Sequence, residues 1–228
     1  DYAASKERLF HIQHADKVSV ITTDDDPCRM IASRVHHRLM RVSAKDIRDQ
    51  SHWPSLQGPH NAQNVACAIA TCKALGLTDE VIEQGLQSYP GLAHRMERVR
   101  ELHGVLYVND SKATNPTSTA PALGAYPSIH WILGGQAKTS DLDACLPFLG
   151  HVKAAYTFGR DGAMLAEVLR PHVAVEQYET LAESVVSAQS KAHAGEVVLL
   201  SPTCASFDQF RDFEHRGEAF RDVVMALD

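Results

Sequence analysis

The fold is decided by the stretch Val105-Leu106-Tyr107-Val108-Asn109-Asp110-Ser111-Lys112-Ala113-Thr114-Asn115-Pro116. Its first four residues can form a short buried strand, and its Asn-Pro end favours a turn or the start of a helix. An acid, a base, two hydroxyls and two amides therefore follow the tip of one strand. Open α/β sheets bind their ligands at that edge, although a solvated surface loop could carry the same residues.

Strand and helix patterns alternate from Arg95 to the end of the chain. The alternation predicts an α/β fold with a mostly parallel, doubly wound sheet of six strands. Only His103-Gly104 separates the first two strands, which predicts an antiparallel hairpin. Strands are expected at 98–102, 105–108, 129–133, 154–158, 173–177 and 197–200, and helices at 118–123, 142–149, 163–169, 181–191 and 208–227.

The first ninety or so residues have a different pattern. They predict an amphipathic helix at 2–13, a strand at 18–21, and helices at 26–37, 60–75 and 79–87. Capping the helix at 26–37 is the preferred role for the acidic run before it, and Thr78 caps the helix at 79–87. The linker Ser88-Tyr89-Pro90-Gly91 predicts a boundary between a domain at 1–91 and a domain at 92–228.

Composition excludes several classes of protein. Hydrophobic residues make up 44% of the chain, which fits a packed core, and the net charge of -6 argues against a nucleic-acid or anionic-membrane partner. The five cysteines are scattered without a CxxC pair, which predicts neither a disulfide framework nor a zinc site and favours a cytoplasmic location. No apolar run approaches the ~20 residues of a membrane span, and no signal peptide is recognisable. The missing initiator Met suggests a processed, truncated or excised chain.

Polar loops follow four of the expected strands. Lys112 and Thr114 follow the strand at 105–108, and Lys138 follows Gly134-Gly135 after the strand at 129–133. Gly159-Arg160-Asp161-Gly162 follows the strand at 154–158, and Ser206 follows the strand at 197–200. Paired glycines allow a backbone to approach a ligand closely. Each loop alone is weak evidence, because these are ordinary turn residues. Together they are expected along one edge of one sheet, where they suit a small anionic ligand or a nucleotide.

Two further residues have alternative interpretations. Arg95 could reach a phosphate across a domain junction or form a structural salt bridge with Glu97 or Glu101. Cys204 is better explained as a packed, inert thiol than as a nucleophile, because the sequence supplies no base for it. A Walker-type phosphate loop is absent from the sequence.

Two asparagines lie near the start of the helix at 60–75. Helix capping is the simplest role for Asn61. Asn64 lies one turn further and needs another explanation, such as a hydrogen bond to an adenine edge.

Five stretches resemble the Mur ligases of bacterial cell-wall synthesis, and among them the branch that adds D-glutamate. These are 58–64 (GPHNAQN), 92–97 (LAHRME), 109–115 (NDSKATN), 133–138 (LGGQAK) and 201–210 (SPTCASFDQF), with 213–217 (FEHRG) extending the last. The third and fifth stretches are the most specific, because sister ligases differ there. The resemblance covers nearly the whole chain.

The resemblance implies three domains in the complete enzyme, of which this chain has the end of the second and all of the third. Residues 1–91 are then the remnant of the central ATPase domain, and 92–228 a Rossmann-like domain that binds the amino acid. The UDP-binding domain, the phosphate loop and the main Mg²⁺ ligands would precede Asp1, so the fragment alone is expected to be an inactive monomer.

The family mechanism implies roles for ten residues. ATP phosphorylates the carboxylate of UDP-N-acetylmuramoyl-L-alanine, and D-glutamate attacks the acyl phosphate. By this resemblance Asn64, Asp110, Lys112 and Arg95 contact ATP, and Thr114, Lys138, Ser206, Phe207 and Phe213 bind D-glutamate. Lys6 matches a lysine that is carbamylated near Mg²⁺ in the family, and a plain solvated lysine is the alternative. A folylpolyglutamate synthase-like ligase and a non-catalytic anion-binding module remain as alternative functions.

Overall fold

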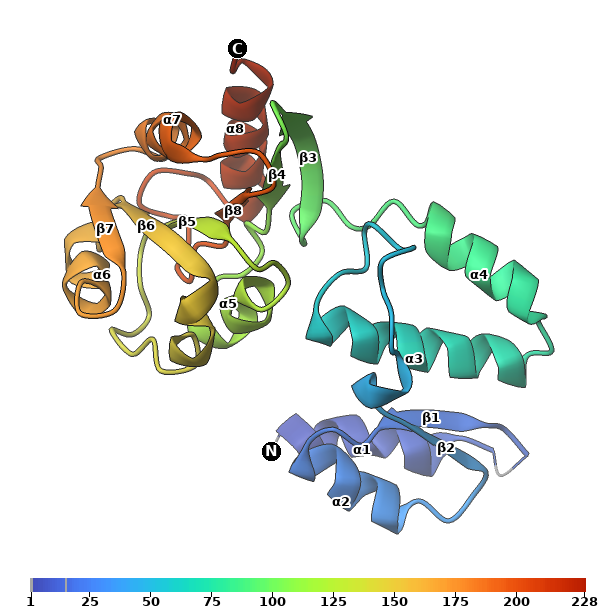
Figure 1. The fold of residues 1–228 in the computed structure, drawn as a ribbon. Helices are drawn as coiled ribbons and strands as arrows, with labels where there is room; N and C mark the ends of the chain where they lie inside the picture. Colours follow the sequence, from blue (N-terminus) through green and yellow to red (C-terminus); the bar gives the residue numbers. More distant parts are fainter. Residues whose placement is uncertain (1, 15) are drawn as a thin grey trace. The chain divides into compact units, whose positions relative to one another are not determined.

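The computed structural model describes residues 2–14 and 16–228. Contacts between Cα atoms divide the chain into two compact units, Asp1–Tyr89 and Pro90–Asp228. The expected boundary after residue 91 lies close to this division. Figure 1 shows the elements of both units, each of which is described by itself.

The first unit combines a small parallel sheet with helices. Its strands β1 and β2 pair in parallel from Ser19 opposite Leu39 to Thr22 opposite Val42. Two expected helix caps are present, because the Asp25 carboxylate accepts from Cys28 N at 2.8 Å and Thr78 Oγ1 accepts from Val81 N at 3.5 Å. The elements are α1 (Tyr2–Ile12), β1 (Ser19–Thr22), α2 (Asp26–Arg34), β2 (Leu39–Val42), the 3-10 turn η1 (Ala44–Asp46), α3 (Pro59–Ala74) and α4 (Asp79–Ser88).

Three expectations for this unit need correction. The helix expected to reach residue 37 ends at Arg34, and the strand β2 was not predicted. The cap of α3 is Gly58, whereas Asn61 lies inside the helix and donates to Gln57 O at 2.9 Å. In α1 only part of the expected apolar side packs: Phe10 contacts the core, but Ile12 is 74% exposed.

The second unit is built around a six-stranded sheet in the order β3-β4-β8-β5-β6-β7. Every pair is parallel except β3 with β4, which form the expected hairpin. His103 (φ 52°) and Gly104 (φ 77°) make the left-handed turn that such a hairpin needs. The strands are β3 (Glu97–Leu102), β4 (Val105–Asn109), β5 (Ile129–Gly134), β6 (Val152–Phe158), β7 (Ala174–Gln177) and β8 (Val197–Leu200).

Helices cover both faces of this sheet, as Figure 1 shows. Alternate residues of β8 enter two apolar clusters, with Leu199 on the α5 and α6 side and Leu200 on the α7 and α8 side. This alternation is the period of a strand that is buried on both faces. The helices are α5 (Pro116–Leu123), α6 (Gly162–Leu169), α7 (Leu181–Lys191) and α8 (Phe213–Met225).

Two helices of the second unit differ from the sequence prediction. The segment 142–149 is not an α-helix, since turns lead into the short 3-10 helix η2 (Leu146–His151). Pro147 stands at its start and cannot donate a backbone hydrogen bond. The last helix begins at Phe213 rather than at residue 208, because the Asp212 carboxylate caps it through His215 N at 2.7 Å.

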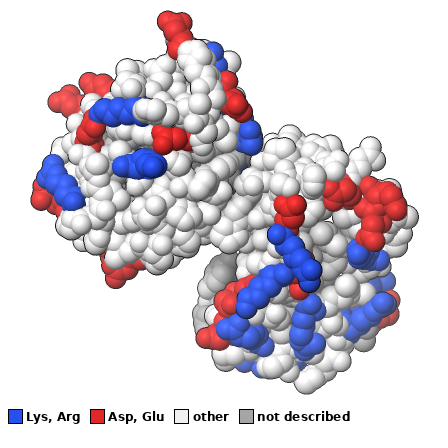
Figure 2. Space-filling model, in the orientation of Figure 1, with Lys and Arg blue, Asp and Glu red and all other residues white. Residues whose placement is uncertain are grey.

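Figure 2 shows one face of the molecule coloured by charge. On the first unit, lysine and arginine side chains are interspersed with acids. Two of the arginines are ion-paired, Arg34 with Glu7 and Arg29 with Asp26. Such alternation is typical of a solvated surface. Within the described residues, no helix is both long enough and apolar enough to cross a membrane.

Candidate functional site

Loops that follow β4, β5 and β8 meet at the carboxyl edge of the six-stranded sheet. Asp110 N donates to Leu200 O at 2.7 Å, and Gly134 N donates to Pro202 O at 3.1 Å. Gln136 and Ala205 exchange two backbone hydrogen bonds of 2.8 and 2.9 Å. The structure therefore brings the loops of Lys112, Lys138 and Ser206 together along one rim.

The approach of these loops depends on two glycines. Gly134 and Gly135 have φ angles of 151° and 123°, which side chains disfavour. A Cβ atom at Gly134 would lie 2.0 Å from Phe158 O, and one at Gly135 would lie 2.3 Å from Ala205 O. Any larger residue would push the β5 loop away from its neighbours.

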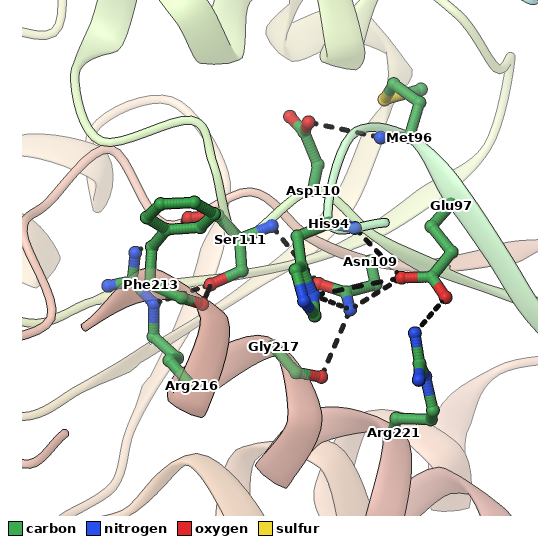
Figure 3. A network of polar contacts seen from close by, with 10 residues as sticks. All are labelled: His94, Met96, Glu97, Asn109, Asp110, Ser111, Phe213, Arg216, Gly217 and Arg221. Atoms are coloured by element: carbon green, nitrogen blue, oxygen red, sulfur yellow. Dashed lines mark hydrogen bonds and ion pairs between the residues drawn. The ribbon is translucent and has the colours of Figure 1, made fainter. Parts of the chain in front are cut away.

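A buried arginine from α8 ties the same three loops together, and Figure 3 shows its contact with Ser111. The side chain of Arg216 is fully buried. It donates from Nε to Ser111 Oγ at 3.0 Å, from Nη2 to Ser111 O at 2.9 Å, and from Nη1 to Cys204 O at 3.0 Å and Gly134 O at 3.3 Å. Burial lowers its pKa to about 10, so the group stays cationic at neutral pH. No role was predicted for Arg216 from the sequence.

Asp110 lies beneath the rim. Its Oδ1 accepts from Met96 N at 3.2 Å and its Oδ2 accepts from Ser201 Oγ at 2.8 Å. Burial raises the pKa of this carboxyl to about 7, against the opposing effect of these hydrogen bonds. Both oxygens thus have partners inside the unit, and the contact of Asp110 with a nucleotide stays a prediction.

Replacing Asp110 with asparagine is expected to flatten the pH dependence of stability. Its folded-state pKa of about 7 lies above the ordinary value of 3.8, so the native carboxyl holds a proton between these values. The neutral Asp110 carboxyl stabilises the fold fully below about pH 4. This stabilisation is lost as pH rises through about 7, at up to ~1.4 kcal/mol of unfolding free energy per pH unit. Asparagine has no such proton to lose. Urea unfolding between about pH 4 and 8 measures the slope.

The control for this experiment is Asp222→Asn, at an exposed position on α8. It should keep the slope of the unmodified chain. Equal slopes for Asp110→Asn and the unmodified chain would contradict the role given to burial.

The remaining rim residues differ in exposure. Lys112 Nζ lies 3.6 Å from the centre of the Phe213 ring, a cation–π contact that was not predicted. Ser206 is buried, whereas Lys138 is exposed and Phe207 is 69% exposed. Thr114 is half-buried in the loop that follows β4. Lys138 and Phe207 are thus available to a ligand, while Phe213 supports the half-buried Lys112.

Arg95 is exposed at the start of the second unit. The structural alternative for it was a salt bridge with Glu97 or Glu101. Glu97 instead pairs with Arg221, and Glu101 lies 3.9 Å from Arg98. Within the described residues neither acid pairs with Arg95, so that alternative is wrong.

Two predicted site residues belong to the first unit. Asn64 lies in α3, where its Nδ2 donates to Asn61 Oδ1 at 3.3 Å. Lys6 is exposed on α1, with Nζ 5.3 Å from the centre of the Tyr2 ring. Their predicted roles are not tested by these contacts.

The described residues form no complete metal site of His, Cys, Asp and Glu side chains, and Cys204 is not an activated thiol. Among residues 2–14 and 16–228, no cluster of three or more His, Cys, Asp or Glu side chains could hold a metal ion. These residues alone therefore do not fit the expected Mg²⁺. Burial raises the pKa of Cys204 to about 11, so it remains a thiol at neutral pH.

Comparison with known proteins identifies related sequences. Residues 94–204 match the family model described as "Mur ligase, glutamate ligase domain". The chain is 57% identical, over 233 residues, to UDP-N-acetylmuramoylalanine--D-glutamate ligase of Sphingopyxis alaskensis. That alignment covers 99% of this chain and 54% of the relative, so the chain spans about half the length of the curated relatives it matches.

Two solved structures share the fold. UDP-N-acetylmuramoylalanyl-D-glutamyl-2,6-diaminopimelate--D-alanyl-D-alanyl ligase of Acinetobacter baumannii aligns with a TM-score of 0.69 and 17% identity, covering 98% of this chain and 54% of that one. The bifunctional folylpolyglutamate synthase/dihydrofolate synthase of Yersinia pestis, complexed with AMPPNP and Mn ion, gives a TM-score of 0.64 and 19% identity. It covers 98% of this chain and 57% of that one. At such identities the likeness concerns the fold alone.

Proposed function

Since the chain belongs to the Mur ligase family, we propose that it is the nucleotide- and amino-acid-binding portion of a ligase that adds D-glutamate to UDP-N-acetylmuramoyl-L-alanine in peptidoglycan synthesis. The complete protein uses ATP to form an acyl phosphate, which the amine of D-glutamate attacks. The fragment alone turns over nothing, because it carries no Walker-type phosphate loop.

The convergence of three loops at the carboxyl edge of the sheet carries this proposal. Lys138 offers a cation there, and Ser206 and Thr114 offer hydroxyls, which together suit the carboxylates of D-glutamate. Phe207 and Phe213 supply apolar contact with its methylene groups. Holding the amino acid at a fixed rim beside a phosphorylated partner contributes proximity to the reaction.

Arg95, Asn64, Asp110 and Lys112 are the residues of this chain assigned to ATP. Arg95 is exposed without an ion-pair partner among the described residues, as a residue that binds phosphates requires. Mg²⁺ would supply charge neutralisation on the phosphates when bound, and its main ligands are proposed to lie outside the described residues. The carbamylation of Lys6 is part of the same proposal.

The complete protein is the decisive test of this function. We expect the full-length protein that contains this chain to release phosphate when given ATP, D-glutamate and UDP-N-acetylmuramoyl-L-alanine, and the chain alone to release none. Colorimetric phosphate measurement with each substrate omitted in turn distinguishes ligation from simple ATP hydrolysis. No release by the full-length protein with all three substrates would refute the proposal.

Two alternative functions differ from the proposed one in the ligands that the protein would bind. A folylpolyglutamate synthase-like ligase, whose fold this chain shares, would use a folate in place of the UDP-linked substrate. A non-catalytic anion-binding module would bind D- and L-glutamate equally. Calorimetric titration of the chain with both enantiomers should show binding of the D-form only, and equal heats would support the module.

A further inference from the structure

The exposed Arg95 is set between two residues with unusual backbone geometry. His94 and Met96 have φ angles of 61° and 50°, a region that residues other than glycine rarely adopt. A backbone hydrogen bond from Arg95 N to Leu92 O at 3.2 Å closes the turn. Strained conformations of this kind persist only where the surroundings fix them.

Several contacts fix the backbone of this turn, as Figure 3 shows in part. His94 N donates to Glu97 Oε2 at 2.9 Å, and Lys112 N donates to His94 O at 3.0 Å. Met96 N donates to the buried Asp110 carboxylate. The backbone on each side of Arg95 is therefore held, while its side chain is exposed.

The ring of His94 is held as firmly as the backbone. It is buried, with Nδ1 3.0 Å from Asn109 Nδ2 and its edge against the Phe213 ring. Asn109 Nδ2 also contacts Glu97 Oε2 at 3.1 Å and Gly217 O at 3.1 Å. Gly217 leaves the space for this ring, since a Cβ there would lie 2.2 Å from His94 Nδ1.

We propose that this clamped turn fixes the direction of Arg95, and that His94, Glu97 and Gly217 are positioning residues acting through it. The inference rests on the proposed function, in which Arg95 reaches the phosphates of ATP. The turn fixes the backbone that carries the guanidinium before the nucleotide arrives, so only the side chain of Arg95 remains to be ordered on binding.

Gly217→Ala in the full-length protein tests the clamp. The added methyl must displace the His94 ring, and we expect kcat/KM for ATP to fall roughly 10- to 100-fold while KM for D-glutamate stays unchanged. Arg95→Ala should likewise lower kcat/KM for ATP and leave KM for D-glutamate unchanged. The matched control is Gly85→Ala, because Gly85 is also helical and nothing lies within 4 Å of its Cβ position.

Substitutions of His94 provide a rescue. The double variant Gly217→Ala with His94→Asn should recover most of the ATP activity, because asparagine is smaller and tolerates positive φ. His94→Asn alone should retain more activity than His94→Val, because valine is β-branched and strongly disfavours this conformation. Loss of ATP and D-glutamate use together, with no rescue, would mean a merely structural role and would overturn the proposal.

Trypsin gives a readout that does not depend on ligation. In the chain itself, Gly217→Ala should speed cleavage after Arg95 by roughly tenfold, whereas cleavage after Lys191, an exposed residue at the end of α7, should not change. Unchanged cleavage after Arg95 would overturn the clamp. Absence of ligation by the unmodified full-length protein would overturn the proposed function instead. If that protein ligates and Arg95→Ala is impaired, normal ATP kinetics in Gly217→Ala would show that the turn does not aim Arg95.

Discussion

Lys138→Ala in the full-length protein is expected to raise KM for D-glutamate roughly 10- to 100-fold and to leave KM for ATP nearly unchanged. The estimate is that of one lost charge-assisted hydrogen bond, about 1.5–3 kcal/mol. Lys138 follows a backbone that is tightly fixed: Ala137 N donates to Asp161 Oδ2 at 2.7 Å, next to the exchange between Gln136 and Ala205. Initial rates at varied D-glutamate and saturating ATP measure the effect.

The control for this change is Lys153→Ala. Lys153 is also exposed, but it lies near the start of β6, and so away from the carboxyl edge of the sheet. It removes the same charge and should leave both KM values unchanged. A larger effect on ATP than on D-glutamate for Lys138→Ala would refute the role given to this lysine.

Arg216→Met is expected to destabilise the second unit by roughly 4 kcal/mol or more. The change leaves three buried carbonyls and the Ser111 hydroxyl without their donor, and each buried polar group that loses its partner costs about 1–3 kcal/mol. Because these groups belong to the three rim loops, D-glutamate binding should be lost as well. Urea unfolding in a Trp53→Phe background, followed by the near-ultraviolet signal of the remaining buried Trp131, measures the stability of this unit.

Arg216→Lys separates charge from geometry. Lysine keeps the cation, but its single ammonium cannot reach all the acceptors that the planar guanidinium bridges. It should therefore recover only part of the stability. As a control, Arg170→Met removes an exposed arginine paired with Glu167 and should change stability by less than about 1 kcal/mol. An equally small change for Arg216→Met would contradict the bridging role.

The sequence predicted the strands better than their order. The strand at 197–200 is confirmed to the residue because its apolar run is short and clearly bounded, and the hairpin follows from His103-Gly104. Nothing in a local pattern shows that β8 lies between β4 and β5, because that placement depends on pairing between distant segments. The strand β2 was missed because its residues are at most half-buried and show no alternation.

The candidate site shows the same division. Lys112, Lys138 and Ser206 could be predicted as neighbours, because each follows a strand and parallel strands end at the same edge of a sheet. The roles of Arg216, Glu97 and Gly217 could not be predicted, since each depends on a contact with a residue distant in sequence. The pair Arg216-Gly217 inside a helix was the available signal, because glycine costs about 1 kcal/mol there and suggests close packing.

The central position of β8 has a consequence for synthesis on the ribosome. The nascent chain completes β4 and β5 long before Val197–Leu200 is translated, yet these strands meet only through β8. Until then each has an unpaired side that invites aggregation. A premature stop codon after α7 would therefore remove β8 together with α8. The truncated product could not join β4 to β5 and would be a substrate for quality-control proteases.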